Sequence, residues 1–269
     1  MTLKNENTVP YLVYNSLEEI NFIKHGFSTR LGGVSEGIFS TMNMAFNRGD
    51  NPDSVTENYR RLCGSVGLDF ESLTASAQDH HTFVRKVTKA DRGVGIYRPR
   101  DMQSVDALIT NERGVTLVTY YADCTPLFFV DTKNKAIGLA HAGWRGTVGR
   151  IGQKVVEKMT AEFGTNPEDL VCAVGPAISK CCYEVDKTCA DEFYALTDLD
   201  NSTFIFTKEN NKFMLDLLET NRQILVKAGV KAENITLSDL CTRCNSDLLW
   251  SHRATNGQRG TMCAVMCLK

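Results

Sequence analysis

The chain has no excess of basic residues, no long apolar run and no apolar leader. Its 30 Lys and Arg against 32 Asp and Glu give a formal net charge of -2, so nothing favours nucleic acid or a membrane surface as a partner. No stretch approaches the roughly 18–20 apolar residues that cross a bilayer. Residues 1–8 are polar and lack the apolar core of a signal peptide. We therefore expect a soluble, cytoplasmic protein.

Linkers, low-complexity stretches and internal repeats are also missing from the 269 residues, of which 42% are hydrophobic and 23% charged. Apolar β-branched runs predict strands, and apolar residues at three- and four-residue spacing predict helices. Strands are expected at 114–121, 126–131, 136–141, 170–174 and 235–238, and helices at 148–163, 186–196 and 213–228. This mixture lacks the regular alternation of a doubly wound sheet. We predict one α+β domain over residues 1–269.

Ten cysteines are unusual for such a chain. Without a secretory signal they are better explained as reduced thiols or metal ligands than as a disulfide framework. The CxxC pair at 241–244 would need the cysteines of 263–267 to complete a zinc site, but zinc ribbons usually combine two matched CxxC pairs, and 263–267 resembles buried core. Cys181 and Cys182 are adjacent, so we expect their side chains to diverge and not to share a metal.

Histidine is scarce, with five residues in the chain, but two regions contain histidines that are candidate metal ligands. Cys124 lies where one predicted strand ends and the next begins, and His141 ends a third strand before a glycine-rich turn that allows close approach to a ligand. The first and third strands can deliver both side chains to one edge of a sheet. His80 or His81, but not both, is a third candidate, because neighbouring side chains of a strand point to opposite faces. Two imidazoles and one thiolate form an open zinc-type site, as catalytic zinc requires.

Several motifs resemble the laccase-domain or polyphenol oxidase family, whose members are described as purine nucleoside phosphorylases that also deaminate adenosine. The resemblance covers the chain from about His25 to near its end. The motifs are His-Gly-Phe-Ser-Thr-Arg at 25–30, Gln-Asp-His at 78–80, Ala-Asp-Cys-Thr-Pro at 122–126, Ala-His-Ala-Gly-Trp-Arg-Gly-Thr at 140–147, Cys-Cys-Tyr-Glu-Val at 181–185, Cys-Thr at 241–242 and Ser-His-Arg at 251–253.

The resemblance implies metal ligands at His80, Cys124 and His141, with zinc as the metal and copper as the alternative. His81 stands where the family commonly has glycine, and it either lines the pocket or only changes the loop. The implied fold is a layered α-β-β sandwich with mixed sheets. The implied reaction is phosphorolysis of adenosine, inosine, guanosine and 5′-methylthioadenosine to a free base and a ribose 1-phosphate, with adenosine deamination in the same pocket. A monomer or a homodimer is expected.

Further residues are candidates for these reactions. Deamination with zinc-activated water needs a proton shuttle, which Asp123 or Glu184 would provide. Phosphorolysis needs a group that holds phosphate, and a guanidinium grips phosphate in a bidentate way. Arg145 is the first candidate because it follows His141 closely. Arg30 and Arg48 come next, and Asn43 is a candidate ribose or substrate contact.

Two other activities use the same residues. Two histidines and a cysteine also suit copper, but five histidines cannot furnish the several centres of a multicopper oxidase. Without a metal, Cys124 could act as a thiolate nucleophile with His141 as its base, which would make the protein a cysteine hydrolase. A binding module without catalysis would leave the open site and Arg145 unexplained.

Overall fold

Two six-stranded sheets form the body of the protein. The computed structural model describes residues 1–6 and 9–269, so residues 7 and 8 of the polar start lie outside the described residues. The first sheet contains, in spatial order, β1 (Thr2–Glu6), β2 (Val9–Val13), β3 (Ile23–Ser28), β15 (Met262–Leu268), β7 (Thr116–Tyr121) and β4 (Leu73–Ala75). The second contains β14 (Ile235–Leu237), β10 (Leu170–Val174), β8 (Thr125–Asp131), β9 (Ala136–Ala142), β6 (Val105–Thr110) and β5 (Phe83–Lys86).

Both sheets are mixed. In the first sheet β4 runs parallel to β7, whereas the remaining pairs are antiparallel. In the second, β5 pairs with β6 and β10 with β14 in parallel, and the other ladders are antiparallel. The predicted α+β fold with layered, mixed sheets is therefore confirmed.

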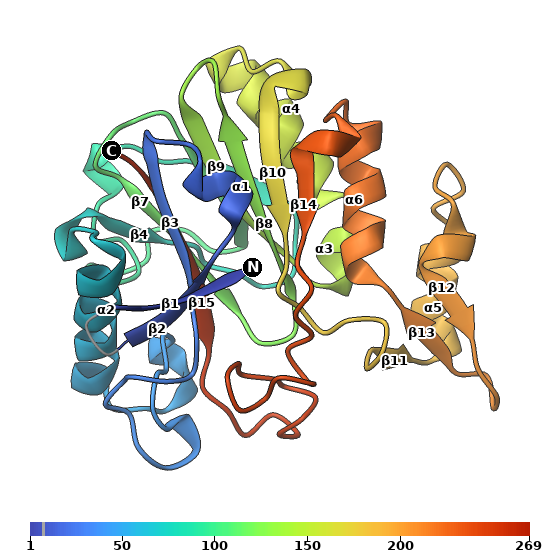
Figure 1. The fold of residues 1–269 in the computed structure, drawn as a ribbon, viewed down its shortest axis with the longest axis horizontal. Coiled ribbons are helices and arrows are strands. Elements are labelled where there is room, and N and C mark those ends of the chain that lie inside the picture. The colour runs from blue at the N-terminus through green and yellow to red at the C-terminus, as the bar shows by residue number, and fades with distance from the viewer. Residues whose placement is uncertain (7–8) are drawn as a thin grey trace.

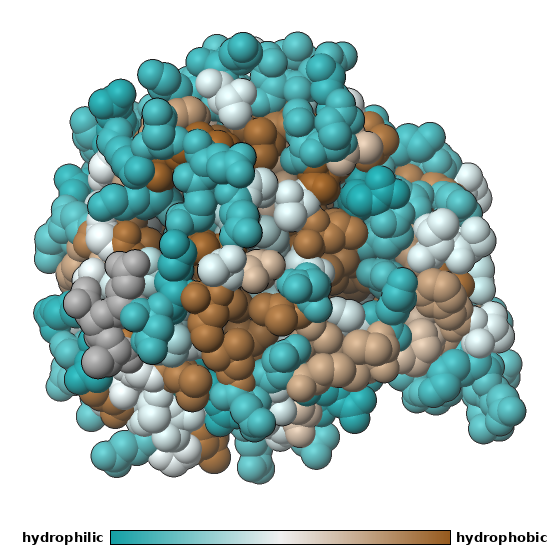
Figure 2. Space-filling model, viewed as in Figure 1, coloured by the Kyte–Doolittle hydropathy of each residue, from teal (hydrophilic) through white to brown (hydrophobic). Residues whose placement is uncertain are grey.

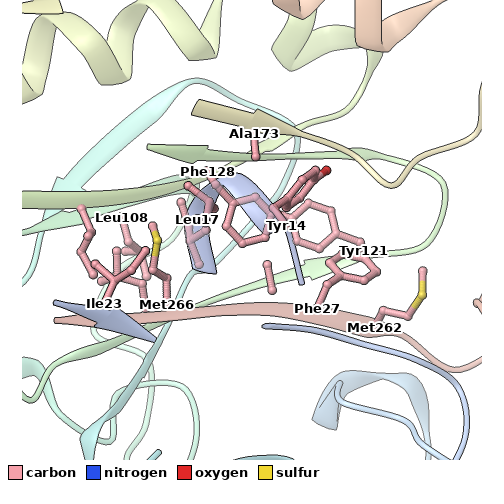
Figure 3. Packing of buried hydrophobic residues seen from close by; sticks show 14 of the residues in the cluster. Tyr14, Leu17, Ile23, Phe27, Leu108, Tyr121, Phe128, Ala173, Met262 and Met266 are labelled. Carbon is pink, nitrogen blue, oxygen red and sulfur yellow. The ribbon is translucent and has the colours of Figure 1, made fainter. Parts of the chain in front are cut away.

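The main hydrophobic core lies between the two sheets. Figure 3 shows Phe27 and Met266 of the first sheet facing Leu108 and Phe128 of the second, with Tyr14 and Leu17 beside them. The strands β7, β8 and β9 are buried along nearly their whole length. Burial of this kind contributes roughly 25 cal/mol per Å² of apolar surface and holds the sheets at a fixed spacing. The spacing matters for the site, because its residues come from both sheets.

Helices cover the outer faces of the sheets. The helix α2 (Pro52–Val66) packs on the first sheet through Val55, Tyr59 and Leu62. The helices α4 (Ile151–Phe163) and α6 (Leu217–Lys227) pack on the second sheet. Two short helices, α1 (Asn15–Glu18) and α3 (Trp144–Val148), complete this body. Among the described residues, no helix is long and apolar enough to span a bilayer.

A small unit projects from the side of the body that carries α6 (Figure 1). It consists of a three-stranded sheet in the order β11 (Glu184–Val185), β13 (Phe213–Leu215) and β12 (Ile205–Thr207), with α5 (Lys187–Tyr194) packed beside it. Its own apolar cluster includes Phe193, Phe204 and Leu215. Figure 2 shows hydrophilic residues over the tip of this unit, and hydrophobic residues gathered nearer the centre of the same face.

Three expectations about local structure are wrong. Residues 213–215 form β13, and the helix begins only at Leu217, because Asp216 caps its N-terminus by accepting from the Glu219 amide at 3.1 Å. The predicted helix 148–163 is split, with α3 ending before α4 starts at Ile151. The side chains of Cys181 and Cys182 do not diverge: they lie in a turn, where side chains need not alternate, and their sulfurs are 3.7 Å apart.

His25, in β3, makes folding stability depend on pH. Its Nε2 accepts a hydrogen bond from the Tyr14 amide at 2.9 Å. Burial lowers the pKa of His25 to about 4, although Glu18 opposes this shift, whereas an unfolded histidine has a pKa of about 6.5. The unfolded chain therefore binds more protons between these values. The contribution of neutral His25 is fully present above pH 6.5 and is lost as the pH falls toward 4.

We predict that His25→Gln, which keeps an acceptor near the position of Nε2 but does not titrate, flattens the loss of stability between pH 6.5 and 4. The difference between wild type and variant should change by ~3 kcal/mol over this range. Urea unfolding followed by circular dichroism at several pH values measures it. Parallel stability curves for the two proteins would contradict the role assigned to His25.

Candidate metal-binding and catalytic site

Three side chains with metal-ligating atoms converge at one end of the sheet sandwich. The ligand atoms of His80, Cys124 and His141 all lie within 4.8 Å of one another. His80 is exposed, Cys124 is half-buried and His141 is buried, so the group runs from the surface to the interior. Two imidazole nitrogens and one sulfur are the donor set of an open zinc or copper site.

The ladder between β8 and β9 places Cys124 beside His141. Pro126 pairs with His141, and Thr125 pairs with Ala142, so Cys124 lies one step beyond the end of the ladder. The expectation that the strand before Cys124 and the strand of His141 share one sheet is wrong, because β7 belongs to the first sheet and β9 to the second. Residues 122–124 carry the chain from one sheet to the other.

Asp106 joins two of the three candidate ligands. Its Oδ1 lies 2.8 Å from Nδ1 of His141. Its carboxylate also accepts hydrogen bonds from the backbone amides of Asp79, His80 and His81 at 3.0–3.2 Å. A carboxylate behind a ligating histidine fixes the tautomer and the direction of the ring. Asp106, which is fully buried in β6, therefore turns Nε2 of His141 toward the site and also holds the loop of His80.

Two residues of the site have left-handed backbone conformations. The φ angles of His80 and Asp123 are 71° and 82°, which non-glycine residues adopt only at some cost. Asp123 is held there by hydrogen bonds. Its carboxylate accepts from the Thr242 hydroxyl at 2.6 Å and from the Arg253 amide at 2.7 Å, and its carbonyl accepts from the Ile178 amide at 2.9 Å. These contacts fix the bend that directs Cys124 into the site.

Gly143 leaves room for the ligand atoms. A Cβ at this position would lie 2.8 Å from Nδ1 of His80 and 3.2 Å from Sγ of Cys124. A contact of 2.8 Å is too short and one of 3.2 Å is tight, so a side chain at this position would displace the His80 ring from its place opposite Cys124. The space, the donor set and the carboxylate behind His141 all fit a bound metal ion.

The protonation of the two histidines differs. Burial and the charge of His141 lower the pKa of His80. Burial also opposes protonation of His141, but the Cys124 thiolate and the Asp106 carboxylate outweigh it and raise the pKa of His141 to about 9. Without a metal, His141 is thus an imidazolium that the buried carboxylate of Asp106 holds in place, with Cys124 beside it.

The ligands open into a hollow of about 190 Å³ that arginines surround. Arg48, Arg100 and Arg259 line it, together with Tyr120 and other residues. The salt bridges of the described residues involve other arginines. Burial and the charge of Arg48 lower the pKa of Arg259 to about 10, and its Nε has no hydrogen-bond partner among the described residues. Arginines that gather without forming a salt bridge are suited to bind an anion.

The other residues proposed from the sequence lie in different surroundings. Arg30 stacks on Trp250 at 3.9 Å and donates to the Ser246 carbonyl. Asn43 is buried, and its amide is bonded to protein groups including Asp50. The structure does not bring these two residues to the hollow with the ligands.

Arg145 and His81 lie close to the ligands in sequence but face elsewhere. Arg145 is exposed, stacks on Trp144 at 4.2 Å and lines a neighbouring hollow with Arg253. His81 is exposed and pairs with Asp79 at 2.6 Å, and this carboxylate raises the pKa of His81.

Sequence reasoning missed Asp106, Arg100 and Arg259. Asp106 carried one signal, a lone carboxylate inside the apolar run Val-Asp-Ala-Leu-Ile, since a buried charge needs a partner. Arg259 precedes Gly260, whose missing side chain accommodates the Trp250 ring. Arg100 lies in an irregular segment and has no local pattern that would single it out.

The fold and site define an α+β protein in which three candidate metal ligands, two histidines and one cysteine, lie beside a hollow lined by arginines. The chain matches the family described as multi-copper polyphenol oxidoreductase laccase over residues 24–269, and it belongs to that family. It is 37% identical to the purine nucleoside phosphorylase YlmD of Bacillus subtilis (strain 168), an alignment that covers 91% of this chain and 88% of that protein. It is 32% identical to human purine nucleoside phosphorylase LACC1, over 91% of this chain and 55% of the human protein.

Solved structures agree. YlmD from Geobacillus stearothermophilus has a TM-score of 0.90 at 34% identity and covers 99% of this chain and 98% of its own. The hypothetical protein YfiH of Bacillus licheniformis has a TM-score of 0.93 at 32% identity, with 99% of each chain covered. These relatives support an enzyme of the purine nucleoside phosphorylase type in a metal-binding family.

We predict that Gly143→Ala abolishes metal binding by His80, Cys124 and His141 without unfolding the protein, because the added methyl group occupies the space between His80 and Cys124. Metal content after dialysis, measured by mass spectrometry, should fall by about one ion per chain. The control is Gly64→Ala in α2, where an added methyl group meets no atom within 4 Å. That variant should keep its metal and gain up to about 1 kcal/mol of stability. Equal metal content in the wild type, Gly143→Ala and Gly64→Ala would show that Gly143 is not part of the metal site.

Proposed function

We propose that this protein is a zinc-dependent purine nucleoside phosphorylase. It cleaves adenosine, inosine, guanosine and 5′-methylthioadenosine with phosphate to a free base and a ribose or 5-methylthioribose 1-phosphate. We also propose adenosine deamination as a second activity, and a single domain over residues 1–269. The observation that carries the proposal is the juxtaposition of the three candidate ligands with Arg48, Arg100 and Arg259 in one hollow.

The arginines supply what phosphorolysis demands. The transition state resembles an oxocarbenium ion at the ribose, and the attacking phosphate must be held beneath C1′. Arg259 is fixed by hydrogen bonds from Nη1 to the Gly260 carbonyl and the Thr261 hydroxyl, each at 2.9 Å. Arg48 is anchored more loosely, by a 3.3 Å bond to the Gly257 carbonyl. A phosphate bound here would gain two cations that form no salt bridge among the described residues.

Arg145 is a second phosphate candidate, and it would act from the neighbouring hollow that it shares with Arg253 and Lys212. The geometry favours Arg48 and Arg259, because they lie in the same hollow as the ligands.

His80, Cys124 and His141 would hold the zinc ion, which supplies Lewis-acid chemistry at its open coordination position. Asp106 keeps Nδ1 of His141 protonated and leaves Nε2 as the ligand atom. Tyr121 packs against the His141 ring, with centroids 5.8 Å apart, and limits access of water from the core side. The site is thus rigid on its buried side and open on the side of the arginines.

Deamination has weaker support than phosphorolysis. The described residues that line the hollow include no aspartate or glutamate. Both carboxylate oxygens of Asp123 accept hydrogen bonds from the protein, and Glu184 is paired with Lys208. A proton shuttle would need one of these carboxylates to leave its partner, or a different group to serve.

A metal-free cysteine hydrolase is the second candidate. Cys124, His141 and Asp106 are arranged as a nucleophile, a base and a carboxylate that orients the base. This mechanism leaves His80 and the arginines without a role. A copper-dependent polyphenol oxidase uses the same ligands, but the chain has five histidines for the several centres of that chemistry.

The decisive experiment incubates the purified protein with adenosine, with and without phosphate, and follows products by chromatography while bound metal is measured. We expect phosphate-dependent release of adenine with zinc bound, and loss of activity together with one bound zinc ion per chain in Cys124→Ala. Inosine formed without phosphate would indicate deamination. Full activity of metal-free protein, abolished by thiol alkylation, would instead identify the cysteine hydrolase.

We predict that Arg259→Gln raises the KM for phosphate ~10-fold or more, because a charge-assisted hydrogen bond is worth about 1.5–3 kcal/mol. The KM for the nucleoside should change little. Initial rates at varied phosphate measure the effect. Arg61→Gln is the control, since Arg61 pairs with Glu57 on α2 at 3.0 Å and should leave both constants unchanged. A phosphate KM that Arg259→Gln does not alter would exclude Arg259 from the phosphate site.

A further inference from the structure

A second group of metal-ligating atoms lies outside the site described above. Cys181, Cys182, Cys241 and Cys244 gather their four sulfur atoms within 4.8 Å of one another. The Sγ atoms of Cys181 and Cys182 are 3.7 Å apart, and they lie 3.6 Å and 3.4 Å from Sγ of Cys244. All four residues are free cysteines. We call this group the four-cysteine cluster.

The spacing of the sulfurs is that of a tetrahedral metal site. Zinc binds thiolate at about 2.3 Å, so two sulfurs of a tetrahedral Zn-S4 centre lie about 3.8 Å apart. The distances between the Sγ atoms of the cluster are close to this value, and they are far longer than the roughly 2.05 Å S–S bond of a disulfide. We propose that the four-cysteine cluster is a structural zinc site, closed by four thiolates. This inference does not rest on the proposed activity.

A backbone amide is directed at one sulfur of the four-cysteine cluster, and the cluster reaches the surface. The Ser179 amide donates to Sγ of Cys241 at 3.4 Å, and hydrogen bonds to a sulfur stabilise its charged form. Cys241 is buried and Cys244 is exposed, which places the cluster at the surface and allows a metal ion to enter.

The four-cysteine cluster would join two loops that are far apart in sequence. One loop follows β10 and the other follows β14, and Figure 1 shows these chain segments descending side by side from the second sheet. Ala177 forms a parallel bridge with Cys241, and its carbonyl accepts from the Thr242 amide at 3.0 Å. A metal ion at the cluster would close this pair of loops with four bonds.

These loops hold Asp123, the residue before Cys124. The Ile178 amide and the Thr242 hydroxyl both donate to Asp123, at 2.9 Å and 2.6 Å. Ile178 belongs to the first loop and Thr242 to the second. Zinc in the four-cysteine cluster would therefore brace the strained bend that positions Cys124, without touching substrate itself.

The test measures zinc at the two sites separately. Cys124→Ala removes the sulfur ligand of the first site, so any zinc that remains reports on the four-cysteine cluster. We expect about one zinc ion per chain in Cys124→Ala and close to none in Cys124→Ala/Cys244→Ser, measured by inductively coupled plasma mass spectrometry. Cys124→Ala/Cys189→Ser is the matched control, because Cys189 is half-buried in α5 and outside the cluster. It should keep its zinc.

A chelator provides a second readout that does not depend on the double variant folding. In Cys124→Ala, EDTA should lower the Tm and should make the four cysteines react with iodoacetamide, as located by peptide mass spectrometry. Alkylation of the cluster at the same rate with and without EDTA would overturn the proposal. Equal zinc in Cys124→Ala and Cys124→Ala/Cys244→Ser would also overturn it, as would a disulfide within the cluster. Loss of phosphorylase activity alone would bear on the proposed function and not on this site.

Discussion

The buried carboxylate of Asp106 is the interaction on which the candidate site depends. Three consecutive backbone amides, from Asp79 to His81, and one imidazole nitrogen of His141 all converge on it. A buried charge without such partners would be strongly destabilising. The same four bonds that make Asp106 tolerable in β6 bring the His80 loop to His141. The positions of His80 and His141 relative to each other thus follow from the hydrogen bonds that stabilise the buried Asp106 carboxylate.

The sequence predicts the parts of this arrangement that depend on local pattern. The strands β7, β8 and β9 follow from their β-branched and aromatic runs, and Cys124 and His141 lie at their ends as expected. The pattern does not tell which sheet a strand joins. Because the crossing between the sheets takes only residues 122–124, the continuous apolar run through β7 and β8 gives no sign that it divides between two layers.

Other features that the sequence does not predict have related causes. The sequence predicts only buried core at 263–267 and not a strand, because these residues are buried on both faces and show no alternation. In the structure β15 pairs with both β3 and β7 in the middle of the first sheet. Asp106 lies 35 residues from His141, and nothing local links them. Cys181 and Cys182 meet because a turn, and not a strand, carries them. For β15 and Asp106 long-range packing decides, and a single sequence does not encode it in any short pattern.

The description of the family as multi-copper does not match the small number of candidate metal ligands in the site. The family is described as multi-copper, yet the described residues offer two clusters of three or more metal-ligating side chains, and one of these contains cysteine alone. The relatives named as purine nucleoside phosphorylases fit better with a small ligand set beside arginines. Sulfur ligands suit copper(I) as well as zinc, so the assignment of zinc and phosphate to this site stays a proposal.

The crossings between the sheets have a consequence for how this protein can change. His80 lies between β4 of the first sheet and β5 of the second, and Cys124 lies between β7 and β8 in the same way. The distance between candidate ligands is therefore a measure of how the two sheets are aligned. A core substitution that lets one sheet slide over the other alters the ligand geometry, even when it lies far from the hollow. The residues inside the sandwich are therefore constrained by the geometry that the candidate ligands need, as well as by packing.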